Sequence, residues 1–503
     1  MSTIRRQSII SSVVVYFGFA LGFFNTYLFT REGGFTKEEY GLTGVFIAIA
    51  NIMFSVASLG MPAYISKFFP YYKAHLQGKK SDQLAWALLL PCIGFLFVLI
   101  AGLVFKNILV DKWFNNSPQL LQYYYWVFPF GFGYTIFLVL EAYAWQHRKA
   151  LVTNLLKEIV FRFFVTVLIV LTSLHFIKSF DVFIALYAFT YLALIIYLLI
   201  YFYGRGQLQL SFKKTIVTHR FYKKILLLVS FVWGGGLVFN VANVFDTIVI
   251  AAVVPNGLAA VGIFTLAQNI SSLIQAPQRA IVSASVGALS QAWKEKDFKK
   301  INTIYHRSSI NQLIFATAMF CLIWLNFKDA IYTFNFQKDY AGAMWAFFFI
   351  GLTRIIDMGT GVNAQIIATS TDWRFEFLSG MILLAIALPL NWQLTRELGL
   401  IGPAISNLIA FTIYNAIRYV FLWKKFRMQP FTIRTLYTVL LSGGCFAVAY
   451  FLFRNEQGFE WMIIRTVTFI LPFVLGMYYL KLSPDVHPVL LTIKKKLKFG
   501  GSN

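Results

Sequence analysis

Cysteine and histidine are scarce in this chain, which has three cysteines and six histidines among 503 residues. Cys92, Cys321 and Cys445 each lie inside an apolar run, so we expect buried thiols and no disulfide. The histidines are scattered, and none has a neighbour at the spacing of metal ligands. The sequence also lacks a glycine-rich nucleotide-binding loop, which excludes ATP hydrolysis by the chain itself. We therefore expect no metal and no cofactor.

Charged residues are also few, at 13% of the chain, whereas hydrophobic residues make up 58%. The mean hydropathy is +0.67, which excludes an ordinary soluble domain. Basic residues number 44 and acidic residues 20, which gives a net charge of +24. No basic segment forms a domain of its own, so we expect no nucleic-acid partner. Membrane topology explains the excess better, because cytoplasmic loops collect Lys and Arg.

Long apolar runs fill the chain from Ser8 almost to its C-terminus. A membrane-spanning helix needs about 20 apolar residues, whereas a barrel strand has about 10 that alternate in polarity. The runs therefore predict an all-α polytopic membrane protein with about fourteen transmembrane helices. The first run continues to Phe29, too far for a signal peptide, so we expect an uncleaved first helix. The predicted spans are 8–30, 41–65, 83–105, 119–145, 155–176, 182–203, 225–252, 259–282, 308–327, 341–367, 377–395, 400–422, 435–453 and 461–480.

Basic residues in the gaps between the runs predict the orientation. Gaps on the side of the N-terminus hold twenty-nine Lys and Arg, and the opposite gaps hold nine. This bias predicts that both termini are cytoplasmic. Termini on one side require an even number of spans, which agrees with fourteen, although twelve or thirteen remain open.

A weak internal repeat divides the chain. A shift of 218 residues places Gly18 on Gly236 and Asn25 on Asn243. Because the shift spans six helices, it predicts two parallel halves that can rock around a substrate bound between them. The predicted regions are an N-terminal six-helix lobe at 1–203, a basic cytoplasmic linker at 204–224, a C-terminal six-helix lobe at 225–422, and helices thirteen and fourteen with a basic cytoplasmic tail at 423–503. The last two helices carry few polar residues, so we expect them to be peripheral.

Several ionisable side chains lie inside the predicted spans, where they are costly unless they face a cavity or one another. They are Lys157, Glu158 and Arg162 on the fifth helix, Asp246 on the seventh, Arg279 on the eighth, and Arg354 and Asp357 on the tenth. Glu158 with Arg162, and Arg354 with Asp357, have the spacing of salt bridges within one helix, which would be purely structural. Lys157, Glu141 and Arg418 lie nearer helix ends, where snorkelling to the surface is the alternative to a place in a cavity.

Polar residues also form stripes along the predicted helices. The stripes are Gln268, Ser272, Gln275 and Arg279 on the eighth helix, Arg354, Asp357, Gly361 and Gln365 on the tenth, Asn51, Ser55 and Ser58 on the second, and Asn240, Asn243 and Asp246 on the seventh. Hydrogen bonds between helices are one explanation. We favour a water-filled cavity, because the stripes extend over several turns on several helices.

Such a cavity would be basic and would attract an anion. Its predicted cationic residues are Lys157, Arg162, Arg279 and Arg354, and the arginines suit phosphate because the guanidinium group donates two hydrogen bonds. Asp246 and Asp357 would balance these charges or bind a coupling cation, either Na+ or H+. The remaining predicted acidic and polar lining is Glu158, Asn25, Asn51, Asn243, Gln268 and Gln275.

Four N-terminal segments carry a resemblance to bacterial polysaccharide flippases. They are IRRQSII at 4–10, GFALGF at 18–23, NTYLF at 25–29 and GFTKEEYGL at 34–42. These flippases belong to the multidrug/oligosaccharidyl-lipid/polysaccharide (MOP) exporter superfamily. The resemblance implies two six-helix halves around a central cavity, with two further helices typical of the polysaccharide branch.

The resemblance also implies a substrate and partners. Such flippases move polyprenyl-diphosphate-linked oligosaccharides from the inner to the outer leaflet of the bacterial inner (cytoplasmic) membrane. The units serve O-antigen lipopolysaccharide, capsule or exopolysaccharide synthesis. Membrane lipids, and a polysaccharide polymerase with its chain-length machinery, are the implied partners.

One departure from related flippases concerns the arginines. Lipid II flippases use cavity arginines on the first, second and eighth helices, whereas this chain offers Arg279 on the eighth and only Arg31 at the outer end of the first. This argues against the peptidoglycan precursor as substrate. The fifth and tenth helices would supply the positive charge instead.

The leading hypothesis is therefore a transporter, not an enzyme, which flips its substrate by alternating access. A proton, a sodium ion or the membrane potential would drive it. A multidrug exporter is the alternative with the same fold, although cationic drugs need an acidic cavity. A membrane glycosyltransferase or polysaccharide polymerase is the alternative of a different class, but such enzymes carry long outer loops that this chain lacks.

Overall fold

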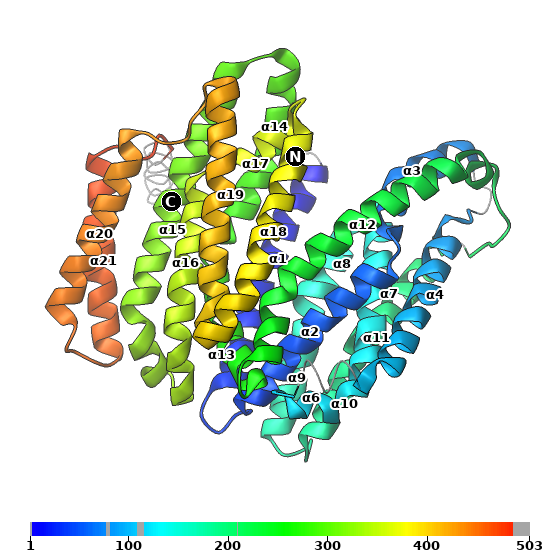
Figure 1. The fold of residues 1–503 in the computed structure, drawn as a ribbon, viewed down its shortest axis with the longest axis horizontal. Helices are drawn as coiled ribbons and strands as arrows, with labels where there is room; N and C mark the ends of the chain where they lie inside the picture. Colours follow the sequence, from blue (N-terminus) through cyan, green and yellow to red (C-terminus); the bar gives the residue numbers. More distant parts are fainter. Residues whose placement is uncertain (1–2, 77–80, 108–114, 209, 486–503) are drawn as a thin grey trace, which may run out of the picture. The chain divides into compact units, whose positions relative to one another are not determined.

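The computed structural model describes residues 3–76, 81–107, 115–208 and 210–485, and their regular elements are helices (Figure 1). The part of the predicted basic tail that follows residue 485 lies outside these residues. By their contacts the residues form two compact units, Met1–Gly262 and Ile263–Asn503. Figure 1 colours the first unit from blue to green and the second from green to red.

The helices of the first unit follow one another with short connections. They are α1 (Thr3–Thr30), α2 (Lys37–Ala57), α3 (Met61–Leu76), α4 (Gln83–Val104), α6 (Pro118–Gln122), η1 (Tyr124–Trp126), α7 (Val127–Gln146), α8 (Ala150–Leu155), η2 (Leu156–Val160), α9 (Phe161–Ser173), α10 (Phe180–Ala188), α11 (Thr190–Gly204) and α12 (Ile216–Val253). Helix α13 (Gly257–Ser272) crosses the boundary between the units.

The second unit continues in the same way. Its helices are α14 (Ala276–Glu295), α15 (Phe298–Thr333), η3 (Lys338–Gly342), α16 (Ala343–Gly359), α17 (Asn363–Thr369), α18 (Trp373–Leu398), η4 (Gly399–Ile401), α19 (Gly402–Phe426), α20 (Ile433–Phe453) and α21 (Phe459–Tyr479). Each of the fourteen predicted spans is covered by one helix or by successive helices. Ten helical stretches of the described chain are long and apolar enough to cross a membrane. The predicted all-α, multi-pass architecture is confirmed.

Side-chain caps fix where several helices begin. Thr36 and Glu39 form a reciprocal capping box at the start of α2. Thr215 and Asp297 each accept a hydrogen bond from a first-turn amide, at the starts of α12 and α15. These caps follow polar connections in the sequence, and the three helices begin before the predicted spans 41–65, 225–252 and 308–327, because the first turns lie in the polar connections that hydropathy excludes.

Helix α12 packs on α2 and α3 within the first unit. The Trp233 indole donates to the Val56 carbonyl at 3.1 Å. Gly60 allows the close approach, since a Cβ there would overlap the Val229 carbonyl of α12. By contacts the chain therefore divides within α13, after Gly262, whereas the sequence repeat places the seventh helix in the second lobe. The lobe boundaries stay a prediction.

Three predicted spans are broken by a turn of three residues. The second breaks at 58–60, the eighth at 273–275 and the tenth at 360–362, between α16 and α17. Gly60 and Gly361 have positive φ, and Pro277 lies in the first turn of α14. The continuous polar stripes predicted for the eighth and tenth helices are therefore wrong, because each stripe crosses a break. The breaks in the second and eighth spans lie near equivalent positions of the repeat, which stays a prediction.

The last two predicted helices contribute to one buried ion pair. Helices α20 and α21 pack on each other and on α15. Arg465 of α21 forms an ion pair with Asp329 of α15, and both side chains are 8% exposed. Arg465 is therefore one of the few polar residues of these helices, and its charge is matched by a carboxylate on another helix.

The cysteines also depart in part from expectation. Cys445 is buried and Cys321 is partly buried, but Cys92 is exposed on the surface of α4. An apolar run in a membrane helix does not imply burial within the protein, because lipid accepts apolar side chains equally well.

Candidate functional site

A charged cluster lies where α1 packs on η2 and α9 in the first unit. The Arg162 guanidinium pairs with the Glu158 carboxylate at 3.0 Å, and their side chains are 26% and 19% exposed. This confirms the predicted salt bridge within one helix. The guanidinium also lies 5.6 Å from the centre of the Phe19 ring on α1.

Asn25 of α1 connects the two helices. Its amide nitrogen donates to the Arg162 carbonyl at 2.8 Å, and its amide oxygen accepts from the Thr166 hydroxyl at 2.6 Å. Gly18 and Gly22 make room, because a Cβ on Gly18 would overlap the Glu158 backbone and one on Gly22 would touch the Arg162 guanidinium. Small residues permit such close approach of helices in membranes.

The backbone beneath the charged cluster is irregular. Residues Leu156–Val160 form one turn of π-helix between α8 and α9, and Lys157 and Glu158 both lie in it. Such π-bulges are rare and occur frequently at functional sites. The bulge changes which side chains share a face, which is an effect that helical spacing alone does not reveal.

Lys157 pairs with Glu141, which was not expected from the sequence. Its ammonium group lies 3.5 Å from the Glu141 carboxylate of α7, and the Glu141 side chain is only 9% exposed. Glu141 is therefore buried rather than extended to the surface. The sequence did not reveal this pair because the partner of Lys157 lies on a neighbouring helix, which the spacing along one helix cannot show.

The remaining predicted polar residues of the first unit are dispersed. The Asn51 oxygen accepts from the Tyr134 hydroxyl of α7 at 3.0 Å, which is a hydrogen bond between helices. On α12, Asp246 is buried and Asn243 is exposed. These residues stay predicted members of a cavity.

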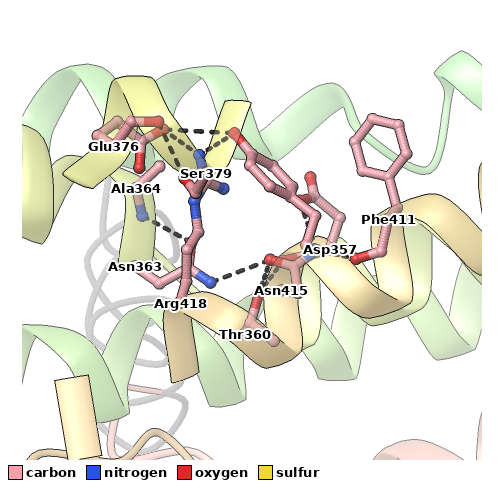
Figure 2. A network of polar contacts seen from close by, with 10 residues as sticks. Asp357, Thr360, Asn363, Ala364, Glu376, Ser379, Phe411, Asn415 and Arg418 are labelled. Carbon is pink, nitrogen blue, oxygen red and sulfur yellow. Dashed lines mark hydrogen bonds and ion pairs between the residues drawn. The ribbon is translucent and has the colours of Figure 1, made fainter. Parts of the chain in front are cut away.

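A second polar network lies in the second unit, around the break between α16 and α17 (Figure 2). The Asp357 carboxylate accepts from the Gln278 amide of α14 at 2.9 Å and from the Asn415 amide of α19 at 3.3 Å. The Asn415 oxygen accepts from the Thr360 hydroxyl at 2.9 Å and from the Asn363 amide at 3.0 Å. Asn415 is 1% exposed, so the network is enclosed.

Arg418 adjoins this network (Figure 2). Its guanidinium pairs with Glu376 of α18 and contacts Tyr414, and the residue is 3% exposed. Arg418 does not snorkel to the surface, because Glu376 on the adjacent helix supplies the counter-charge.

The other predicted residues of the second unit surround the network. Arg354 is partly buried on α16, one turn before Asp357, and their predicted ion pair stays a prediction. Gln268 is partly buried on α13, and Gln275 lies in the break before α14. Arg279 is exposed on α14, next to Gln278.

Sequence reasoning missed six members of this network, namely Gln278, Thr360, Asn363, Glu376, Tyr414 and Asn415. Gln278 directly precedes the predicted Arg279, and Glu376 precedes the predicted eleventh span by one residue. Tyr414 and Asn415 lie inside a predicted span as moderately polar residues. Only the packing of α14, α16, α18 and α19 brings them together.

The four predicted cationic residues divide between the units. Lys157 and Arg162 belong to the first, and Arg279 and Arg354 to the second. That they line one shared cavity stays a prediction. Among the described residues, no three His, Cys, Asp or Glu side chains gather as a metal site. The oxygens near Asp357, from Thr360 and Asn415, are the kind that hard cations bind.

A large apolar pocket of about 780 Å³ also opens in the first unit. It lies between α2, α4 and α7, and its lining includes Ile52, Met53, Phe97 and Phe128. It contains almost no polar surface and is suited to hydrocarbon.

Solved structures of transporters share this fold. The lipid II flippase MurJ, in an inward closed conformation, matches with a TM-score of 0.73 and 16% identity over 94% of this chain and 99% of that chain. An inward-facing multidrug resistance MATE family transporter of the MOP superfamily matches with a TM-score of 0.61 and 16% identity over 82% and 94%. A MOP superfamily transporter from Pyrococcus furiosus matches with a TM-score of 0.55 and 15% identity over 84% and 95%. The chain therefore has the fold of these transporters.

Comparison with curated proteins finds no significant match. A family model described as "Polysaccharide biosynthesis protein" matches residues 4–293, which is more than half of the chain. The match begins with the segments that carry the sequence resemblance and extends through α14. The chain belongs to the polysaccharide biosynthesis protein family.

Proposed function

We propose that this protein flips polyprenyl-diphosphate-linked oligosaccharide repeat units from the inner to the outer leaflet of a bacterial cytoplasmic membrane. The units would serve synthesis of a surface polysaccharide, namely O-antigen, capsule or exopolysaccharide. The carrying observation is that both units hold arginine and carboxylate groups among apolar helices, in a chain of this family and fold. Such groups are expensive in lipid and mark pathways for polar substrates.

Positive charge for a diphosphate would come from Arg354, Arg279, Arg162 and Lys157. Arg162 and Lys157 are held by Glu158 and Glu141, so binding there requires the phosphate oxygens to displace a carboxylate. This exchange keeps the arginine paired throughout the cycle, which avoids an isolated charge in low dielectric. Arg279 is exposed and would be the first of the four to meet an incoming headgroup.

The lipid tail needs an apolar path beside the polar one. The pocket between α2, α4 and α7 offers about 780 Å³ of nearly pure hydrocarbon lining. A polyprenyl chain packed there would leave its diphosphate free to reach the polar groups of the helices. Because bilayer lipid accepts an apolar chain equally well, the pocket would guide the tail rather than hold it tightly.

Transport would follow alternating access, with the energy supplied by Na+, H+ or the membrane potential. Outward movement of a negatively charged headgroup gains about 2.3 kcal/mol per charge for each 100 mV of inside-negative potential. The oxygens of Asp357, Thr360 and Asn415 would serve a coupling cation. A polymerase and its chain-length machinery would receive the product.

A multidrug exporter is the second candidate, and the match to a MATE transporter favours it. The predicted cavity residues include four basic side chains, which oppose a cationic drug. Deletion of the gene would therefore remove surface polysaccharide without changing drug resistance, whereas an exporter would give the opposite result.

Charge reversal at Arg354 tests the proposal. We expect Arg354→Glu to reduce surface polysaccharide at least about tenfold in a deletion strain while protein in the membrane stays at the wild-type level. A reversed charge repels the diphosphate, and one lost charged contact is worth about 1.5–3 kcal/mol. The matched control is Arg396→Glu, at an exposed arginine near the end of α18. Full complementation by Arg354→Glu would contradict the role of this residue.

A further inference from the structure

A polar pocket lies at one end of the last two helices, away from the groups assigned to transport. It has a volume of about 250 Å³ and lies between the C-terminal part of α15, the first turn of α16, the end of α20 and the start of α21. All of these elements belong to the second unit. The helices α15, α20 and α21 pack on one another, so the pocket is built into the fold rather than formed by a loop alone.

The pocket has a fixed floor. Arg465 pairs with Asp329, and its guanidinium also donates to the Leu325 carbonyl at 3.2 Å and to the Glu456 carbonyl at 3.4 Å. Its Nε donates to the Trp461 carbonyl at 3.3 Å. These bonds tie α21 to α15 and to the connection from α20. Arg465 is therefore a positioning residue that holds the walls of the pocket in place.

The rim of the pocket is basic. Lys328 of α15 and Arg454 at the end of α20 both line it and are both exposed. Neither forms an ion pair within the part of the chain that the structure describes. The five ionisable side chains of the lining are three basic and two acidic, so the pocket carries a net positive charge.

Aromatic side chains place the pocket at the edge of the bilayer. Trp324, Tyr332 and Tyr450 line it, and the two tyrosines are 54% and 42% exposed. Trp and Tyr are enriched at the membrane–water interface, where an apolar ring meets a polar headgroup layer. A basic pocket at this depth faces phosphate groups of lipids, not acyl chains.

We propose that this pocket binds a phosphate group, that of an anionic lipid headgroup, between Lys328 and Arg454 above the Arg465–Asp329 pair. Lys and Arg form charge-assisted hydrogen bonds with phosphate oxygens. The bound lipid fastens α20 and α21 to α15. This inference is independent of the proposed substrate, because it concerns a resident lipid that stays at the periphery of the second unit.

Lipid binding to the purified full-length protein tests the proposal. Native mass spectrometry would measure retention of phosphatidylglycerol by the wild type, by Lys328→Gln and by Arg454→Gln. We expect each variant to lose affinity about fivefold, the effect of one basic residue near a charged headgroup. Arg396→Gln, at an exposed arginine that does not line the pocket, is the matched control and should bind as the wild type does.

Two further measurements separate the outcomes. Arg454→Lys keeps the charge and should restore binding, which excludes a loss caused by misfolding. Inorganic phosphate is the second probe, and it should compete only weakly with phosphatidylglycerol. Unchanged lipid retention in both Gln variants, or an equal loss in Arg396→Gln, would overturn the proposal. Full competition by millimolar phosphate would assign the pocket to a free anion and would overturn the lipid as its ligand.

Discussion

At the scale of single residues, buried charges in this protein are matched across helices. Arg418 and Arg465 are 3% and 6% exposed, and each pairs with a carboxylate from another helix. Lys157 does the same with Glu141. The spacing along the sequence predicted the Glu158–Arg162 pair because both residues lie on one helix. It missed the other pairs because their partners are far apart in sequence.

Removal of the partner of Arg418 should be strongly destabilising. Glu376→Gln leaves a buried guanidinium without its counter-charge, so we expect a loss of about 3–5 kcal/mol of folding free energy. Thermal unfolding of the purified protein in detergent would measure it. Asp372→Asn is the matched control, because Asp372 pairs with the 48% exposed Lys425 at 2.5 Å and should cost less than about 1 kcal/mol. Equal shifts in both variants would contradict the prediction.

His147 makes stability depend on pH. It lies between α7 and α8, where burial and then Lys73 and Lys149 lower its pKa below the usual value of 6.5. The folded state therefore binds the proton less well than the unfolded state, and stability falls as the pH drops below 6.5. We expect His147→Gln to lose less thermal stability between pH 7 and pH 5 than the wild type loses. The control is His219→Gln, at an exposed histidine, which should keep the wild-type dependence of thermal stability on pH. If His147→Gln also keeps the wild-type dependence, this role of His147 is refuted.

At the scale of elements, the sequence located the helices but not their interruptions. Apolar runs must form helices in lipid, because backbone groups have no other partners there. A break such as that between α16 and α17 does not lower the hydropathy of the run, so hydropathy does not reveal it. The breaks and the π-turn at Leu156–Val160 depend on which neighbours satisfy the freed backbone groups. Ser308 does this at the break, where its hydroxyl accepts from the Val362 amide at 3.3 Å.

The break at Gly361 should not tolerate a side chain. Gly361 has φ +66°, and a Cβ there would overlap Ser308 and the Ser309 backbone. We expect Gly361→Ala to cost about 1–3 kcal/mol, from backbone strain and from this overlap. Gly443→Ala in α20 is the matched control, because a Cβ there meets open space and alanine favours the helix. The melting temperature should fall in Gly361→Ala and rise in Gly443→Ala. An unchanged melting temperature in Gly361→Ala would contradict the requirement for a helix break at this glycine.

At the scale of the whole molecule, the fold is that of a multi-pass transporter with two units. The order and number of apolar runs set this architecture, since each run must cross the bilayer. The contact boundary after Gly262 was not foreseen, because it depends on α12 packing against α2 and α3. The bias of basic residues predicts the orientation in the membrane, and this prediction is open to a direct test.

Cysteine labelling would check the orientation. In a variant without Cys92, Cys321 and Cys445, we expect Lys213→Cys to be protected from a membrane-impermeant maleimide in intact cells. Glu32→Cys, in the connection between α1 and α2, should be labelled, because that connection is predicted to lie outside. Both positions are exposed in the structure, so burial does not explain a difference. The reverse pattern would place both termini outside.

The sequence by itself determined that this protein lies in a membrane and that its main elements are helices. The length of each apolar run, the scarcity of charge within it and the basic residues beside it are local properties of the sequence. They can be recognised without knowing which helices pack together. Only the tertiary structure decided which charges are neutralised, where helices break, and which polar side chains meet around Asp357 and Asn415. The physical reason is that low dielectric makes each buried charge depend on its nearest partner, and that partner is chosen by packing between helices.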